Sequence, residues 1–230
     1  MRPKDRFSPF EFGLVICTAF GWYILTAVFA LISGLGRAVE ESSSQLAYGN
    51  THLLGVALYE GLITPVLLAI LHTRGWRIAD FRPGVSMPAT ALGVALAVAA
   101  YVLYWLIGGL LALLYPVAQS ALDAAGSYQP STGPSLAAVL LVSMVNPVFE
   151  EVFVCAYVIE ALQPRFGMTT AVNVSVAIRV SYHLYQGISV FPFHCAYGLL
   201  QAHVYVRYGR LWPLIVSHAL LDFAAFVQLT

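Results

Sequence analysis

The chain has 230 residues, of which 60% are hydrophobic and only 10% are charged. Soluble domains carry roughly 25% charged residues, so this composition excludes an ordinary soluble domain and predicts a membrane protein. Eleven basic and eleven acidic residues cancel, which excludes a nucleic-acid-binding protein, since such a protein needs a basic surface. Because lipid leaves open backbone unsatisfied, we expect an all-α, polytopic transmembrane helix bundle.

Seven apolar runs are long enough, or nearly so, to cross a bilayer, which takes about 20 residues. The first follows a short basic N-terminus without a small-residue cleavage site, so we interpret it as a retained anchor and not as a signal peptide. The fifth and sixth runs are the shortest and the most polar. The predicted spans are 11–33, 52–71, 89–115, 135–162, 169–187, 189–206 and 211–228.

Basic residues gather in alternate connections between these spans, while the opposite side carries Arg37 alone. Basic loops mark the cytoplasmic face of a membrane protein. We therefore expect an integral protein, most naturally of the plasma membrane, with a cytoplasmic N-terminus and an external C-terminus. The basic residues assigned to the cytoplasmic side are Arg2, Lys4, Arg6, Arg74, Arg77, Arg82, Arg165, Arg207 and Arg210.

The polar stretches 37–51 and 116–134 are interpreted as external loops and not as linkers between domains. We expect one integrated membrane domain, in which residues 1–134 form an N-terminal three-span region and residues 135–230 carry the chemistry described below.

Ionisable side chains inside the predicted spans single out candidate site residues. A charge in the hydrocarbon layer costs about 2.5 kcal/mol or more, so each one needs a partner or a function. Spans four, five and seven carry such residues at similar distances from their cytoplasmic ends, and residues four apart share one helix face. The candidate set is Glu150, Glu151, Arg179, His183, His218 and Asp222.

Other polar residues in the spans receive a plainer interpretation. For Glu60 and His194, each taken alone, we favour an ordinary hydrogen bond between helices. Glu160, His203 and His52 are expected near the membrane interfaces, where long or amphipathic side chains reach water.

Glu150 and Glu151 are adjacent, so on a regular helix they point about 100° apart. We therefore expect that they do not both face one small pocket. Pro147 removes a backbone donor just before them and predicts a kink that opens room for water or substrate.

The candidate set can support peptide hydrolysis. A glutamate beside a histidine can deprotonate water, and a second histidine backed by a carboxylate can stabilise a developing oxyanion. Two histidines and a carboxylate can also hold zinc, with Glu150, His183 and His218 as ligands. However, the chain has no H-E-x-x-H helix, so the metal signal is weak and we expect that no cofactor is required.

These residues resemble a known family. The run P-V-F-E-E at 147–151, His183 on the next span and His218-x-x-x-Asp222 on the last resemble the CPBP family. These are the CAAX-prenyl-protease and bacteriocin-processing intramembrane proteases, also called the Abi family. The family motifs E-E-x-x-x-R, F-x-x-x-H and H-x-x-x-N or H-x-x-x-D have counterparts in this order, and the run at 208–212 is similar to the family's lead-in to the last helix.

The resemblance covers about residues 135–228 and implies a four-helix catalytic core in the C-terminal half. It implies an intramembrane endopeptidase acting on a membrane-associated or lipid-anchored protein or peptide. Within that resemblance Glu150 is the base that activates water and His183 assists it. His218 and Asp222 build the oxyanion site, and Glu151 is the supporting second acid.

Two positions depart from the family pattern. Cys155 stands where the first motif has arginine, and Arg179 stands where the second has an aromatic residue. We hypothesise that Arg179 pairs with Glu151 and supplies the lost cation, since both buried charges need compensation; the alternative is that Arg179 reaches a water-filled cavity or the headgroups. A sortase-like thiolate at Cys155 is disfavoured by the nearby carboxylate, so we expect a small buried filler.

The other two cysteines, Cys17 and Cys195, are interpreted as packing residues, because three cysteines fit neither a disulfide framework nor a paired-cysteine zinc site. Two alternatives to the protease stay open. A non-proteolytic relative, a membrane binding or immunity protein, would keep the pocket, and the substitution at Cys155 favours it. A proton-coupled transporter would use the buried acids as a relay, but the sequence has no inverted repeat.

Overall fold

The computed structural model describes residues 7–35, 49–114, 133–186 and 190–230, and within these ranges every regular element is a helix. The predicted all-α fold is therefore confirmed, and each predicted span coincides with a helical stretch to within a few residues. The long elements are α1 Pro9–Leu35, α2 Asn50–Thr73, α3 Met87–Leu114, α5 Leu136–Glu150, the π-helical segment η3 Glu151–Tyr157, α6 Val158–Phe166, α7 Met168–His183, α8 Phe191–Tyr208 and α9 Trp212–Val227.

Among the described residues, four helical stretches are long and apolar enough to cross a membrane: α1, α2, α3 and the continuous helix Leu136–Phe166. The remaining three, α7, α8 and α9, have 16, 18 and 16 residues, which corresponds to about 24–27 Å at 1.5 Å per residue. A bilayer core is about 30 Å thick. The chain is an integral membrane protein, and separate crossings by α7, α8 and α9 stay predictions.

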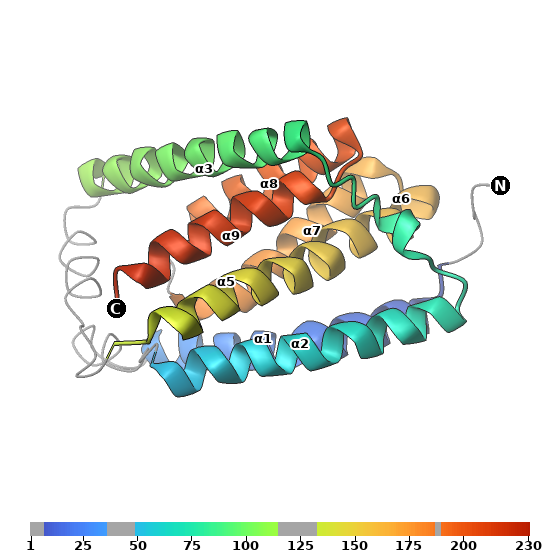
Figure 1. Ribbon diagram of the computed structural model, residues 1–230, viewed down its shortest axis with the longest axis horizontal. Helices are drawn as coiled ribbons and strands as arrows, with labels where there is room; N and C mark the ends of the chain where they lie inside the picture. Colours follow the sequence, from blue (N-terminus) through green and yellow to red (C-terminus); the bar gives the residue numbers. More distant parts are fainter. Residues whose placement is uncertain (1–6, 36–48, 115–132, 187–189) are drawn as a thin grey trace.

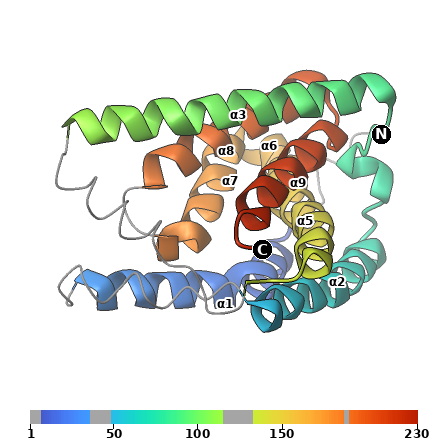
Figure 2. The same ribbon diagram turned by 60° about the vertical axis from the view of Figure 1, so that its left-hand side comes forward.

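The helices are arranged around the continuous stretch α5–η3–α6. In this stretch 67% of the residues in an 18-residue apolar segment are buried, against 17–22% in the corresponding segments of α1, α2 and α3. Figures 1 and 2 show α3 along α9 on one side of the bundle, α1 and α2 on the opposite side, and α5, α7 and α8 between them. The helices that carry the candidate site residues therefore lie between α3 on one side and α1 and α2 on the other.

The connections that carry basic residues lie together at one end of the bundle. Nε of Arg74 lies 3.0 Å from Oε2 of Glu11 near the start of α1, and Arg82 lies 2.9 Å from Glu160 of α6. Figure 1 shows α1 beginning at this end and α9 finishing at the other. This agrees with the one-sided charge distribution, although Arg2, Lys4, Arg6 and Arg37 lie outside the described residues.

The start of α9 is fixed against the start of α3. The backbone N–H groups of Leu211 and Trp212 donate to the carbonyl oxygens of Arg82 and Pro83, at 2.8 and 3.0 Å. Further along, α3 approaches α9 at Gly93, where an added Cβ would lie 2.6 Å from Cβ of Val216. The absent side chain thus permits the close packing that positions α9.

The helix that carries the two glutamates is irregular beside them. Pro147 lies within α5, and four residues later the backbone changes to the π-helical segment η3. Such segments insert a wider turn into an α-helix and are frequent at functional sites. The structure therefore has a π-helical segment next to the position where Pro147 predicts a kink.

Candidate active site

A buried ion pair between α7 and η3 forms the centre of the site. One terminal nitrogen of Arg179 donates to both carboxylate oxygens of Glu151, at 2.7 and 2.8 Å. The Arg179 side chain is 2% exposed and that of Glu151 is fully buried. This confirms the predicted pairing across neighbouring helices and excludes the alternative in which Arg179 extends to the headgroups. The other terminal nitrogen of Arg179 is also buried, and it has no hydrogen-bond partner among the described residues.

Space for the Arg179 side chain comes from α8. A Cβ added at Gly198 would lie 3.4 Å from Cδ of Arg179, and the Tyr197 ring centroid lies 5.6 Å from its Cζ. A cation over an aromatic face is favourable when both are shielded from water. Cys155 is 1% exposed and packs in the main hydrophobic core, as expected of a small buried filler. Arg179 therefore supplies from α7 a cation that position 155 lacks.

Glu150 faces the same group of side chains. The Tyr182 hydroxyl donates to Oε2 of Glu150, the second terminal nitrogen of Arg179 lies 3.6 Å from that oxygen, and Nε2 of His218 lies 4.0 Å from it. The expectation that adjacent glutamates would not share a pocket is wrong. The guanidinium reaches both carboxylates, and the π-helical segment that begins at Glu151 breaks the regular helical spacing.

His218 lies between carboxylates that approach both of its ring nitrogens. Its Nδ1 is 2.8 Å from Oε1 of Glu151, and its Nε2 is 3.5 Å from Oδ1 of Asp222. The other oxygen of Asp222 accepts a 2.9 Å hydrogen bond from the Asn146 side chain. Glu151, and not Asp222, therefore makes the shorter contact that orients the ring.

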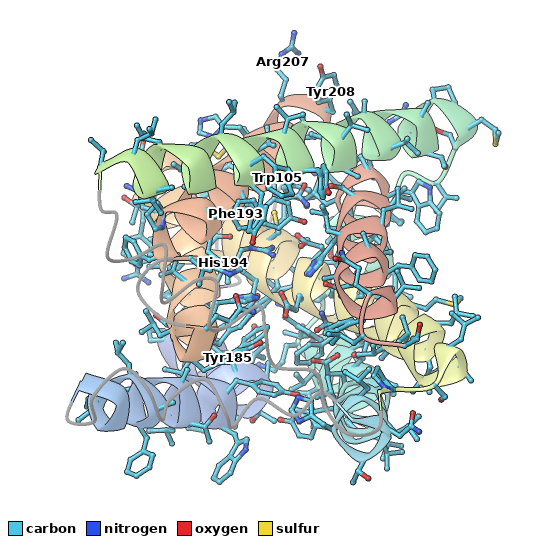
Figure 3. The ribbon with its side chains drawn as sticks, turned by 90° about the vertical axis from the view of Figure 1, so that its left-hand side faces the viewer. Trp105, Tyr185, Phe193, His194, Arg207 and Tyr208 are labelled. Atoms are coloured by element: carbon cyan, nitrogen blue, oxygen red, sulfur yellow. The ribbon has the colours of Figure 1, made fainter. Side chains whose placement is uncertain are left out.

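His183 has a different environment from the one expected. Its Nδ1 lies 2.9 Å from the Arg179 carbonyl oxygen one turn earlier, and its ring stacks on His194 with centroids 4.0 Å apart. In Figure 3, His194 and Phe193 point from α8 toward the interior below α3, whereas Arg207 and Tyr208 project outward. The hydrogen bond to Glu150 comes from Tyr182, the neighbour of His183.

Several contacting residues are missing from the sequence-based set. Asn146 precedes Glu150 by four residues and so shares its helix face, which is a signal in the sequence. Tyr182 and Tyr197 carry no such signal, because buried tyrosines on apolar helices are common packing residues. His194 is interpreted from sequence as an ordinary interhelical contact. In the structure its Nε2 donates to Oε1 of Gln186 at 2.7 Å, and its ring stacks on His183.

A zinc ion held by Glu150, His183 and His218 stays a prediction that no metal cluster in the described residues supports. Among the residues that the structure describes, no group of three or more histidine, cysteine, aspartate or glutamate side chains is placed to hold a metal. The site is instead a network of carboxylates neutralised by Arg179 and His218.

A comparison with protein families agrees with this geometry. Residues 132–224 match the family model described as type II CAAX prenyl endopeptidase Rce1-like. The match runs from just before α5 into α9 and includes Glu150, Glu151, His183, His218 and Asp222. No curated protein and no solved structure gave a match to the chain.

Proposed function

Through residues 132–224 the chain belongs to the Rce1-like family of CPBP membrane proteases, and from this premise we propose that it is an intramembrane endopeptidase. It hydrolyses a peptide bond in a membrane-associated or lipid-anchored protein or peptide, using water activated by Glu150. The observation that supports this most directly is the network in which Arg179 and His218 contact both Glu150 and Glu151.

The two glutamates differ in a way that suits different roles. Glu151 is fully buried and both its oxygens are occupied by Arg179, so it anchors the network. Glu150 is 8% exposed at its side chain, and its contacts with Tyr182 and Arg179 all involve Oε2. This leaves Oε1 to accept a proton from water, which makes Glu150 the general base.

His218 suits stabilisation of the oxyanion that forms when water attacks the carbonyl. Its Nδ1 is held by Glu151, which favours a proton on that nitrogen and fixes the ring plane. Its Nε2 is directed to the side where Glu150 and Asp222 lie. A preorganised donor beside the attacking water is the arrangement that lowers the barrier of acyl transfer. His183, stacked on His194, assists in positioning substrate or water.

The non-proteolytic alternative depends on the loss of the motif arginine at Cys155. The contact between Arg179 and Glu151 weakens that argument, because both oxygens of the glutamate keep a cationic partner. We place the enzyme in the plasma membrane with the basic end of the bundle in the cytoplasm, in contact with membrane lipids and a membrane-associated substrate. No cofactor is needed in this scheme.

A cleavage assay with the purified full chain in detergent tests the proposal. The probes are a quenched fluorescent farnesylated peptide with a C-terminal cysteine-aliphatic-aliphatic tail, and the same peptide without the lipid. The variant Glu150→Gln should lower the rate by about 10²–10⁴-fold. Glu160→Gln is the matched control, because Glu160 pairs with Arg82 away from the site. Equal rates for the wild type and Glu150→Gln would contradict the assignment.

Metal dependence is tested in the same assay. Cleavage should persist after prolonged dialysis against a chelator, because the scheme activates water with a carboxylate. Loss of activity on chelation, with recovery on adding zinc, would favour a metal mechanism instead.

A further inference from the structure

A third buried glutamate lies next to the candidate site but outside the family-matched segment. Glu60 belongs to α2 and is 2% exposed. Its Oε1 has one hydrogen-bond donor, the Tyr23 hydroxyl at 3.5 Å, which is at the outer limit of such contacts. Its Oε2 is buried and has no hydrogen-bond partner among the described residues. The interhelical hydrogen bond expected from sequence therefore leaves half of this carboxyl group unsatisfied.

The packing of α2 turns Glu60 toward the catalytic helices. One turn earlier, Ala57 packs in a cluster with Val139 and Val142 of α5, bordered by Phe223 of α9. The next residue, Gly61, would place a Cβ 3.9 Å from Val145 of α5. Glu60 lies between these two positions in the sequence, so the side of α2 that carries it faces α5 and α9.

The other three carboxyl groups of the site differ from Glu60 in their partners. Glu151 contacts Arg179 and His218. Glu150 accepts from Tyr182, and Asp222 accepts from Asn146. An ionised carboxylate without a comparable partner is costly to bury. Because Glu60 is 2% exposed and its Oε2 has no hydrogen-bond partner among the described residues, a neutral carboxylic acid is the form that this environment accommodates.

Peptide hydrolysis needs an acid as well as a base. The base takes a proton from water, but the amide nitrogen leaves readily only when it is protonated. We propose that Glu60 is this acid, a further catalytic residue supplied by α2, and this inference rests on the proposed endopeptidase function.

The proton balance of the step closes. Glu150 accepts a proton from the attacking water, and the C–O bond to the substrate carbonyl forms. The C–N bond then breaks while the leaving nitrogen takes the proton of Glu60. The proton held by Glu150 afterwards restores the acid form of Glu60, so one water is consumed and one carboxylic acid and one amine are produced.

The test compares two substrates that differ in their need for an acid. The probes are the farnesylated peptide amide and the same peptide with a thioester in place of the scissile amide, since a thiolate leaves without protonation. Glu60→Gln should slow amide cleavage by about 10²-fold and leave thioester cleavage nearly unchanged. Glu150→Gln should slow both. Equal slowing of both substrates by Glu60→Gln, or no slowing of either, would overturn the proposal.

A second readout needs no substrate. Infrared spectra of the purified protein in lipid vesicles report the carbonyl stretch of a protonated carboxyl group. Glu60→Gln should weaken this band, whereas the control Glu160→Gln should not, because Glu160 is paired with Arg82. A band unchanged by Glu60→Gln would also overturn the proposal. If Glu60→Gln folds poorly, the variant Glu60→Asp takes its place, because it keeps a carboxyl group. It is compared with wild-type protein that has been heated until the same fraction is unfolded, and it should cleave the amide faster than that sample.

Failure of the inference is distinguishable from failure of the proposed function. An active wild type in which Glu60→Gln cleaves the amide normally contradicts only the role of Glu60. A wild type that cleaves neither probe contradicts the endopeptidase itself, and with it the catalytic role of Glu60.

Discussion

Arg179 on α7 holds Glu151 on η3 by two hydrogen bonds, of 2.7 and 2.8 Å, from one nitrogen. The family pattern has an arginine four residues after this glutamate, on the same helix, and here that position is Cys155. The cation is thus supplied from a neighbouring helix. It reaches the same carboxylate and ties two helices together, which an arginine on the same helix would not do.

Removal of Arg179 should destabilise the fold as well as abolish activity. Arg179→Gln leaves Glu151 buried without a cation, and breaking a buried pair by removing one partner typically costs about 3–5 kcal/mol. Unfolding of the purified protein in detergent by heat or denaturant measures the loss. Arg165→Gln is the control, since Arg165 is exposed, and it should change stability little. Equal stability of the two variants would mean that the ion pair contributes nothing.

Restoring the family pattern should rescue the loss of Arg179. Cys155→Arg alone should destabilise, because Cys155 is 1% exposed and a larger side chain overfills the core. In the double variant with Arg179→Phe, the arginine at position 155 can occupy the space that Arg179 leaves and can pair with Glu151. The double variant should be more stable than either single variant, with a coupling energy of about 0.5–3 kcal/mol. Simple additivity of the two losses would show that the positions do not share Glu151.

The sequence predicts the helices well because hydrophobic length is a local property. The predicted span 135–162 is the least regular helix, and Pro147 in that span predicts an irregularity. The π-helical form of η3 has no simple sequence pattern and could not be predicted. Counting residues from the cytoplasmic ends of the predicted spans predicts similar depths for Glu150, His183 and His218. The pairing of Arg179 with Glu151 could be predicted because two buried charges of opposite sign need each other.

Contacts that depend on the orientation of neighbouring helices could not be predicted. Tyr182 and His183 are adjacent, and only the rotation of α7 decides which of them reaches Glu150. Glu60 is unremarkable when taken alone, and its relation to Glu150 follows from the packing of α2 on α5. The close approach of α3 at Gly93 likewise depends on where α9 lies.

Tyr182 should affect catalysis more than stability. Its hydroxyl donates to Oε2 of Glu150, and a hydrogen bond to a charged group contributes about 1.5–3 kcal/mol. Tyr182→Phe should therefore lower kcat by roughly 10–100-fold, since each 1.36 kcal/mol is about tenfold in rate. Tyr205→Phe is the matched control, because Tyr205 donates to Glu160 at 3.0 Å, away from the site. Equal kcat values for the two variants would argue against a role for Tyr182 in holding the base.

Two glycines of α3 should respond in opposite ways to alanine. At Gly93 an added Cβ would lie 2.6 Å from Cβ of Val216 and 2.8 Å from the Pro213 carbonyl oxygen, so α9 must shift. Overpacking of this kind costs about 1–3 kcal/mol, and because α9 carries His218, activity should fall too. At Gly108 an added Cβ meets no atom within 4 Å, and an alanine in a helix is favoured over glycine by roughly 0.5–1 kcal/mol.

Thermal unfolding and peptide cleavage, measured on the same preparations, check this pair of glycine variants. Gly93→Ala should lower both the unfolding temperature and kcat, whereas Gly108→Ala should leave kcat unchanged and raise the unfolding temperature slightly. The comparison is informative because the two substitutions add the same methyl group to the same helix and differ only in what that group touches. If Gly93→Ala were as stable and as active as Gly108→Ala, then α3 would not hold α9 in position, and the placement of His218 would have to depend on its contacts with Glu151 and Asp222 alone.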